Sequence, residues 1–396
     1  MRKNHATVFY ALTQVAIWGT YGFLFSYANP YMTEKLGLSD TLAGWLLCLA
    51  TGLACLLQPL LTAVADHTRW NVRRILLCSG LLTALCAGMT LLPGLSVAAY
   101  AVLFCGACVF LQIQPAFSNA MGMEGIHGGL NINFAVARGV GSVSFGLGAK
   151  VSASLIGVMG MNGAPLLGAC SAMLLVVAVL LMPKGSRLTP KAEESPTSAR
   201  EFFRESPKMA ALLVGIMLLY VGHNVLSNCM FRIAQWKVAG GGNATAVQGT
   251  AVMIAAIVEL PTMFLFTKLG KRFRCDKLVL TSCLFMTLRI VASILLPGQW
   301  GLYITQLAQI LGYALFAVST VYYVGTVVPK HNVVKGQTYL GLANTLGSLL
   351  AFALGGSLID AIGVPWMLGV CAGLSVLGLL LAALSLERVE QTVGAA

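Results

Sequence analysis

Long runs of apolar residues, each near the length that crosses a lipid bilayer, recur along the whole chain. Twelve can be distinguished, at 7–32, 41–65, 74–92, 97–121, 131–158, 163–183, 208–234, 245–267, 277–297, 300–328, 334–360 and 364–386. A transmembrane helix needs about 20 mostly apolar residues, whereas a barrel strand is about ten residues of alternating polarity. The pattern therefore predicts an all-α membrane protein with twelve transmembrane helices.

Composition agrees with this interpretation and adds a division of the chain. Apolar residues make up 58% of the 396 positions and charged residues only 10%. One segment, 184–207, is rich in charge, serine and proline, which is typical of a solvent-exposed linker. We therefore expect an N-terminal six-helix half at 1–183, a cytoplasmic linker at 184–207, and a C-terminal six-helix half with a short tail at 208–396, with a short amphipathic turn near 199–205.

The net charge of +12 could suggest a nucleic-acid partner, but its distribution indicates membrane topology instead. Lysine and arginine gather at the N-terminus, in the linker and in alternate connections, whereas the opposite connections hold only Lys35, Arg232 and Lys237. Because lysine and arginine are retained on the cytoplasmic side, we expect both termini in the cytoplasm of a multi-pass protein of the cytoplasmic (inner) membrane. The eleven cysteines lie mostly within spans, which favours packing over metal or redox chemistry.

Ionisable side chains inside the spans are the first candidates for function. They are Arg138, His223, Glu259 and Arg289, in the fifth, seventh, eighth and ninth spans. A charge at the bilayer centre costs about 2.5–3.5 kcal/mol unless it meets a partner or a wet cavity. The structural alternative is a Glu259–Arg289 ion pair bracing two helices, with His223 a satisfied core residue. Lys150 lies nearer the outside, where snorkelling to the membrane surface would explain it.

Polar and aromatic side chains accompany this cluster in both halves. An amide buried without a partner costs about 1–3 kcal/mol, so their number favours a wet cavity over a dry core. They are Gln14, Trp18, Tyr21, Gln112, Gln114, Asn119, Asn224, Asn228, Gln306, Gln309 and Asn344.

The halves also resemble each other in sequence. A short basic connection follows both the second and the eighth span, and small residues mark both the fifth and the eleventh. Parallel repeats of this kind occur in transporters, whose substrate site lies near the midplane between them.

The connection after the second span is similar to the signature loop of the major facilitator superfamily. Asp66, Arg73 and Arg74 match that loop, although Thr62 replaces its first glycine. The resemblance implies two pseudo-symmetric six-helix halves, secondary transport by alternating access, and a conformational role for the three matching residues.

A closer resemblance covers most of the chain and is to the oligosaccharide:proton symporters (lactose-permease-like) and the phenylpropionate-permease-like group. It rests on the segments 57–60, 134–142, 258–260 and 286–290, with Gly222, His223 and Gln306 closer to the second group. In the symporters the helix 5 arginine and helix 8 glutamate contact substrate, and the helix 9 arginine assists proton release. The resemblance implies these roles for Arg138, Glu259 and Arg289.

The candidate site combines these roles with the polar path. The substrate-binding set is Arg138, Glu259, His223, Trp18, Asn119, Asn344 and Gln309, and the proton-coupling set is Glu259, Arg289 and His223. We expect the charged members to converge on one central cavity between the halves.

Departures from the symporter pattern bear on the substrate. The helix 4 glutamate of those proteins is replaced by Ser118 and Asn119, and their helix 10 polar residues by Gln306, Gln309 and Gly312, so lactose itself is disfavoured. Two arginines against one glutamate leave a positive surplus, and guanidinium is well shaped for a carboxylate. We therefore expect a small aromatic carboxylate, with an oligosaccharide as the close alternative because aromatic rings and amides suit a sugar.

The functional expectation is a monomeric secondary transporter in contact with membrane lipid, coupled to protons or, alternatively, to sodium. No Walker sequence indicates ATP drive. A polytopic membrane enzyme, such as a glycosyl or acyl transferase, is the alternative from another class, but no catalytic loop is evident. A nucleoside or drug transporter of the same fold is a further alternative. No catalytic residue, metal, cofactor or nucleic-acid partner is expected.

Overall fold

The computed structural model describes residues 6–67, 71–183 and 198–389. Within these residues the backbone forms helices joined by short turns, with no strand. The chain divides into two compact units, the first comprising Met1–Lys191 with Asn243–Ala256 and the second Ala192–Gly242 with Ile257–Ala396. The predicted boundaries of two six-helix halves stay a prediction, because part of one helix groups with the first unit.

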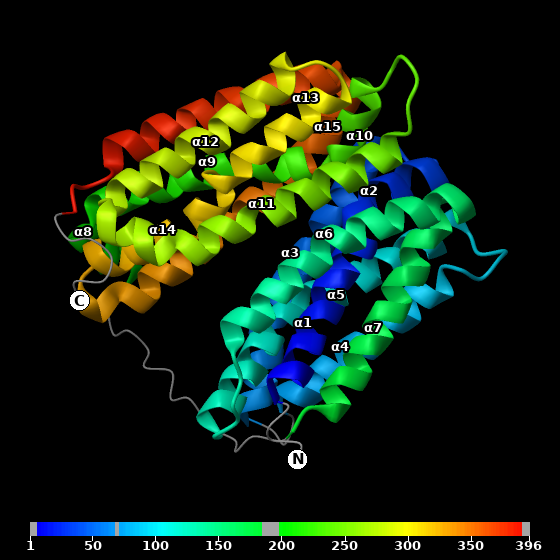
Figure 1. Cartoon of the computed structure of the whole chain (residues 1–396), viewed down its shortest axis with the longest axis horizontal. Helices are drawn as coiled ribbons and strands as arrows, with labels where there is room; N and C mark the ends of the chain where they lie inside the picture. Colours follow the sequence, from blue (N-terminus) through cyan, green and yellow to red (C-terminus); the bar gives the residue numbers. More distant parts are fainter. Residues whose placement is uncertain (1–5, 68–70, 184–197, 390–396) are drawn as a thin grey trace. The chain divides into compact units, whose positions relative to one another are not determined.

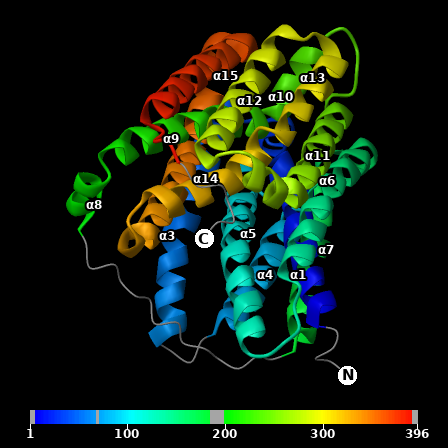
Figure 2. The same ribbon diagram turned by 60° about the vertical axis from the view of Figure 1, so that its left-hand side comes forward.

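Figures 1 and 2 show the helices in chain order. The first unit holds α1 (Ala6–Phe23), the short helices η2 (Phe25–Tyr27), α2 (Ala28–Pro30) and η3 (Tyr31–Lys35), α3 (Asp40–His67), α4 (Val72–Met89), α5 (Val97–His127), α6 (Phe134–Met159), η4 (Gly160–Asn162) and α7 (Gly163–Leu181). The second holds α8 (Ala199–Glu205), α9 (Pro207–Asn228), α10 (Met230–Lys237), α12 (Cys275–Leu295), α13 (Gly298–Gln306), η5 (Leu307–Ile310), α14 (Tyr313–Val327), η6 (Lys330–Asn332) and α15 (Val333–Ser385). Helix α11 (Ala244–Arg272) contributes to both.

Twelve passes follow from these helices, as predicted. Ten stretches in the described residues are long and apolar enough to cross a membrane, and two of these are long enough for two passes each. The first double stretch breaks at Gly160 (φ 65°), between α6 and α7, and the second at Gly363 (φ 79°), inside α15. Both backbones lie in a region that favours glycine. The breaks occupy corresponding places in the two units.

The same packing scheme recurs in each unit. In the first, α1 packs on α6 and α7, and α4 packs on α5 and α7, as Figure 1 shows. In the second, α9 packs on α15, and α12 packs on α14 and α15. Each unit surrounds its own apolar core, centred on residues such as Ile17 and Leu175 in one and Leu219 and Phe316 in the other. The predicted pseudo-symmetric fold is confirmed.

The tenth pass is not the single helix expected at 300–328. It runs as α13, the 3₁₀ turn η5 and α14, with Gly312 in a non-helical conformation (φ −84°, ψ −112°). A mid-helix stretch of 3₁₀ geometry often marks a functional position. The interruption places Gln306 at the end of α13 and Gln309 in the 3₁₀ turn.

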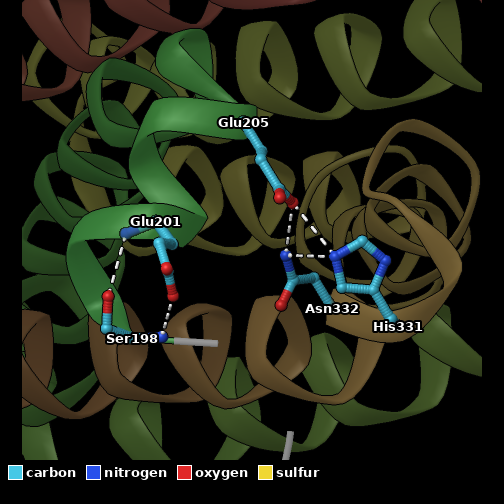
Figure 3. A network of polar contacts seen from close by, with 5 residues as sticks. All are labelled: Ser198, Glu201, Glu205, His331 and Asn332. Atoms are coloured by element: carbon cyan, nitrogen blue, oxygen red, sulfur yellow. Dashed lines mark hydrogen bonds and ion pairs between the residues drawn. The ribbon is translucent and has the colours of Figure 1, made fainter. Parts of the chain in front are cut away.

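The short turn expected in the linker is present as α8 (Figure 3). Ser198 accepts a hydrogen bond from the Glu201 backbone N–H, while the Glu201 carboxylate accepts one from the Ser198 N–H, which forms a capping box. Glu205 Oε2 then accepts a hydrogen bond from Asn332 Nδ2 (2.8 Å) and lies 3.1 Å from His331 Nε2. The buried ring of Phe202 contacts Tyr339 on α15, so α8 is attached to the second unit.

We expect Gly363→Ala to destabilise the protein, because an alanine at φ 79° is strained by about 1–3 kcal/mol. Thermal unfolding of the detergent-purified protein measures this as a lower Tm. Gly369→Ala is the matched control in the same helix, since its added Cβ meets no atom within 4 Å and alanine favours helix. Equal Tm values for the two variants would contradict the assignment of a break at Gly363.

Candidate functional site

A buried guanidinium lies at the centre of the polar cluster in the second unit. Arg289, on α12, is only 3% exposed. Its Nη1 lies 3.3 Å from His223 Nδ1 on α9, and its Nη2 donates to Gln306 Oε1 on α13 at 2.5 Å. Because a guanidinium has donors and no acceptor, His223 Nδ1 must accept. The imidazole is therefore neutral here and carries its proton on Nε2.

The neighbours of Arg289 are themselves held in place. Gln306 Nε2 donates to the Leu302 carbonyl (3.0 Å) and to Thr305 Oγ1 (3.1 Å), which turns its carbonyl oxygen toward Arg289. The His223 ring stacks on Tyr313, with centroids 4.5 Å apart and planes 10° from parallel. Three helices thus fix the position of the guanidinium.

Glu259 joins this cluster from α11. Gln309 Nε2 donates to its carboxylate at 3.1 Å, and Glu259 also interacts electrostatically with Arg289. Two buried atoms of the cluster, Arg289 Nε and Gln309 Oε1, have no hydrogen-bond partner among the described residues. Buried polar atoms are normally satisfied, so this region is suited to water or a polar ligand.

A second cluster lies in the first unit, around the half-buried Arg138 of α6. Its guanidinium lies over the Trp18 ring, 4.1 Å from the centroid, and Nη1 donates to Ser142 Oγ at 2.9 Å. Trp18 stacks on Tyr21, with centroids 5.2 Å apart, and its Nε1 donates to Gln14 at 3.0 Å. Cation, aromatic rings and amide therefore form one contiguous group on α1 and α6.

The predicted site residues divide between the two clusters. Arg138 and Trp18 lie together in the first unit, and His223, Glu259, Arg289 and Gln309 lie together in the second. Asn119 is exposed on α5, and Asn344 is half-buried on α15. Their convergence on one cavity stays a prediction.

Two further polar residues have partners within the first unit. Lys150 donates to Thr250 Oγ1 at 2.7 Å, and its snorkelling to the membrane surface stays a prediction. Gln114 is fully buried and donates to Thr83 Oγ1 of α4 at 2.9 Å, while its Oε1 has no hydrogen-bond partner among the described residues. Tyr313 was missed, because an isolated aromatic residue in an apolar span has no sequence signal that separates it from packing.

The residues of the signature-like loop are only partly described. Arg73 donates to the carbonyls of Leu180 (2.9 Å) and Met182 (2.8 Å), at the C-terminal end of α7. A cation there meets carbonyls that the helix leaves unsatisfied. Arg74 is exposed, and the Asp66 side chain and residues 68–70 lie outside the described residues.

Comparison with known sequences yields a full-length match. The model of the MFS_1 like family matches residues 10–370. A maltose permease of Geobacillus stearothermophilus is 27% identical over 405 residues, which cover 99% of this chain and 96% of the permease. The uncharacterized MFS-type transporter Rv1250 of Mycobacterium tuberculosis is 27% identical over 184 residues, covering 46% of this chain and 31% of that protein.

Solved structures show the same fold. A mutant of the nucleoside transporter NupG matches with a TM-score of 0.78 at 14% identity, covering 98% of this chain and 100% of that chain. The peptide transporter POT in complex with sulfate matches with a TM-score of 0.74 at 16% identity, covering 96% and 94%. At such low identity the likeness concerns the fold alone.

We expect Gln306→Leu to lower the Tm, because it leaves a buried charged donor of Arg289 unpaired, which costs more than about 1–3 kcal/mol. Gln306→Glu restores an acceptor for Arg289 but loses the donor to the Leu302 carbonyl, so we expect it to recover only part of the loss. Gln337→Leu is the control in the same unit, where the amide donates only to the Val321 carbonyl at 2.8 Å. A Gln306→Leu protein as stable as Gln337→Leu would show that Gln306 does not hold Arg289.

Proposed function

We propose a function for this chain, which belongs to the MFS_1 like family and is a membrane transporter, not an enzyme. It moves a small neutral sugar by alternating access, in symport with protons. The proposal includes a cytoplasmic-membrane location with both termini inside, and two halves at 1–183 and 208–396 joined by the linker. It also includes a conformational role for Asp66, Arg73 and Arg74.

The observation that carries the substrate proposal is the environment of Arg289. A positive surplus of two arginines over one glutamate favours an anionic ligand only if both arginines reach it. Arg289 is buried, and both of its terminal nitrogens donate to protein acceptors. Glu259 interacts electrostatically with Arg289 in the same unit, so Arg138 remains as the arginine with donors for a ligand. A single guanidinium can donate to sugar hydroxyls as well as to a carboxylate, so the anionic ligand that two available arginines favoured is no longer required.

The character of the remaining groups supports a sugar. Trp18 and Tyr21 offer half-buried aromatic surface, and the predicted set adds the amides of Asn119, Gln309 and Asn344. Apolar rings with a few placed polar groups are typical of small-molecule sites. The likeness to a maltose permease over 99% of the chain points to the same substrate class.

A small aromatic carboxylate is the second candidate. It is favoured by the position of Arg138, whose planar guanidinium could bind a carboxylate through two hydrogen bonds while a ligand ring stacks near Trp18. A nucleoside is supported only by a likeness of fold to NupG.

Proton coupling is proposed for Glu259, with His223 and Arg289 beside it. Glu259 is the acidic residue in the central part of a span, whereas Asp66, Glu124 and Asp360 lie near span ends. The hydrogen bond from Arg289 requires a bare Nδ1 on His223, so protonation of that nitrogen and the Arg289 contact exclude each other. A proton at His223 would free Arg289 to turn toward Glu259.

We expect Glu259→Gln to abolish uphill accumulation of sugar in proteoliposomes with an imposed pH gradient, while sugar exchange at equal concentrations persists. The reason is that the amide cannot carry a proton but retains hydrogen bonding. Glu124→Gln, near a span end, is the matched control and should accumulate sugar as the wild type does. If Glu259→Gln and His223→Gln both accumulate sugar normally, protons are not carried here and sodium dependence should be measured.

Substrate class is decided by competition against labelled maltose uptake. We expect neutral disaccharides to inhibit and phenylpropionate-like acids to have no effect. Arg138→Lys should raise KM about tenfold, because the planar group over Trp18 is lost although the charge remains. Uptake of labelled acid with inhibition by acids alone would replace the sugar by the carboxylate.

A further inference from the structure

Gln14 is the most enclosed polar side chain next to the Trp18–Arg138 pair. It lies on α1, one turn before Trp18, and is 1% exposed. Its Oε1 accepts from Trp18 Nε1 at 3.0 Å, and its Nε2 donates to Tyr10 OH at 2.9 Å and to Ser118 Oγ at 3.1 Å. Because an indole nitrogen only donates, the amide oxygen must face Trp18. The orientation of the amide is therefore determined by its three partners.

The Trp18 indole is held along the edge that carries its nitrogen. Gln14 binds Nε1, and Gly141 of α6 packs beside the adjacent ring atom, where an added Cβ would lie 2.6 Å from Trp18 Cδ1. A real Cβ does not approach so closely, so the indole needs a glycine at 141. The Arg138 guanidinium lies over the ring held in this way.

We propose that Gln14 is a positioning residue of the binding site, which fixes the Trp18 ring so that ring and Arg138 guanidinium form a preset surface for the ligand. The ligand class, a neutral sugar, rests on the proposed function. The Trp18 N–H is committed to Gln14 and is not a donor to the ligand. Trp18 supports the guanidinium over its ring, and Arg138 contributes the hydrogen bonds to sugar hydroxyls.

Preorganisation gives this arrangement its effect on affinity. A tryptophan free to change rotamer would have to be immobilised each time a ligand binds, which weakens binding by roughly three- to tenfold for one side chain. Loss of Gln14 should therefore raise KM for maltose by this factor and leave Vmax nearly unchanged. A residue that only supported folding would reduce the amount of active protein and lower Vmax.

A double-mutant cycle in proteoliposomes tests the proposal. Gln14→Leu and Trp18→Phe are measured singly and together, with Gln114→Leu as the matched control of a buried glutamine in the same unit. We expect Gln14→Leu to raise KM three- to tenfold alone and by less than twofold in the Trp18→Phe background, which lacks the N–H. Equal effects of Gln14→Leu in both backgrounds, or an equal KM rise in Gln114→Leu, would overturn the proposal.

A second measurement needs no substrate. In ¹⁵N-tryptophan-labelled protein, the Trp18 indole signal is identified by its absence in Trp18→Phe, and its N–H exchange with solvent is followed by NMR. We expect at least tenfold faster exchange in Gln14→Leu than in wild type, and unchanged exchange in Gln114→Leu. Unchanged exchange in Gln14→Leu would overturn the positioning role. If exchange behaves as expected while the wild type transports no sugar, the proposed substrate fails and the role of Gln14 stands.

Discussion

Inside an apolar helical bundle, neighbouring groups must balance the charge of a guanidinium and accept its hydrogen bonds. Arg289 sets this requirement in the second unit, and three helices meet it. Gln306 presents its carbonyl oxygen, His223 presents a bare ring nitrogen, and Glu259 balances the charge. The protonation state of His223 is thus a consequence of the donor-only chemistry of its neighbour.

The two amides that contact the charged cluster of the second unit, Gln306 and Gln309, lie at the interruption of the tenth pass. Gln306 is the last residue of α13, and Gln309 lies in the 3₁₀ turn that follows. Residues three apart also share a face of a continuous α-helix, so the two amides would lie on one side in either geometry. Across the interruption, Gln306 contacts Arg289 and Gln309 contacts Glu259.

The first unit accommodates the half-buried cation of Arg138 in a different way. Arg138 lies over an indole and donates to a serine, and the indole is in turn held by an amide. The electrostatic attraction between a cation and an aromatic face is strong where water is scarce. The two units share a packing scheme but differ in chemistry, with an aromatic surface in one and a hydrogen-bonded charge cluster in the other.

The sequence by itself determined the number of membrane passes and their approximate positions, because the thickness of a bilayer imposes a length on every apolar run. It also identified Arg138, His223, Glu259 and Arg289, since an ionisable residue in an apolar span is conspicuous without any structure. Only the tertiary structure decided which partners these residues have. Pairing depends on helix rotation, depth and side-chain direction, which hydrophobic length does not encode. Arg289 donating to His223 and Gln306, the break before Gly312, and the hold of Gln14 on Trp18 are therefore properties of the packed helices.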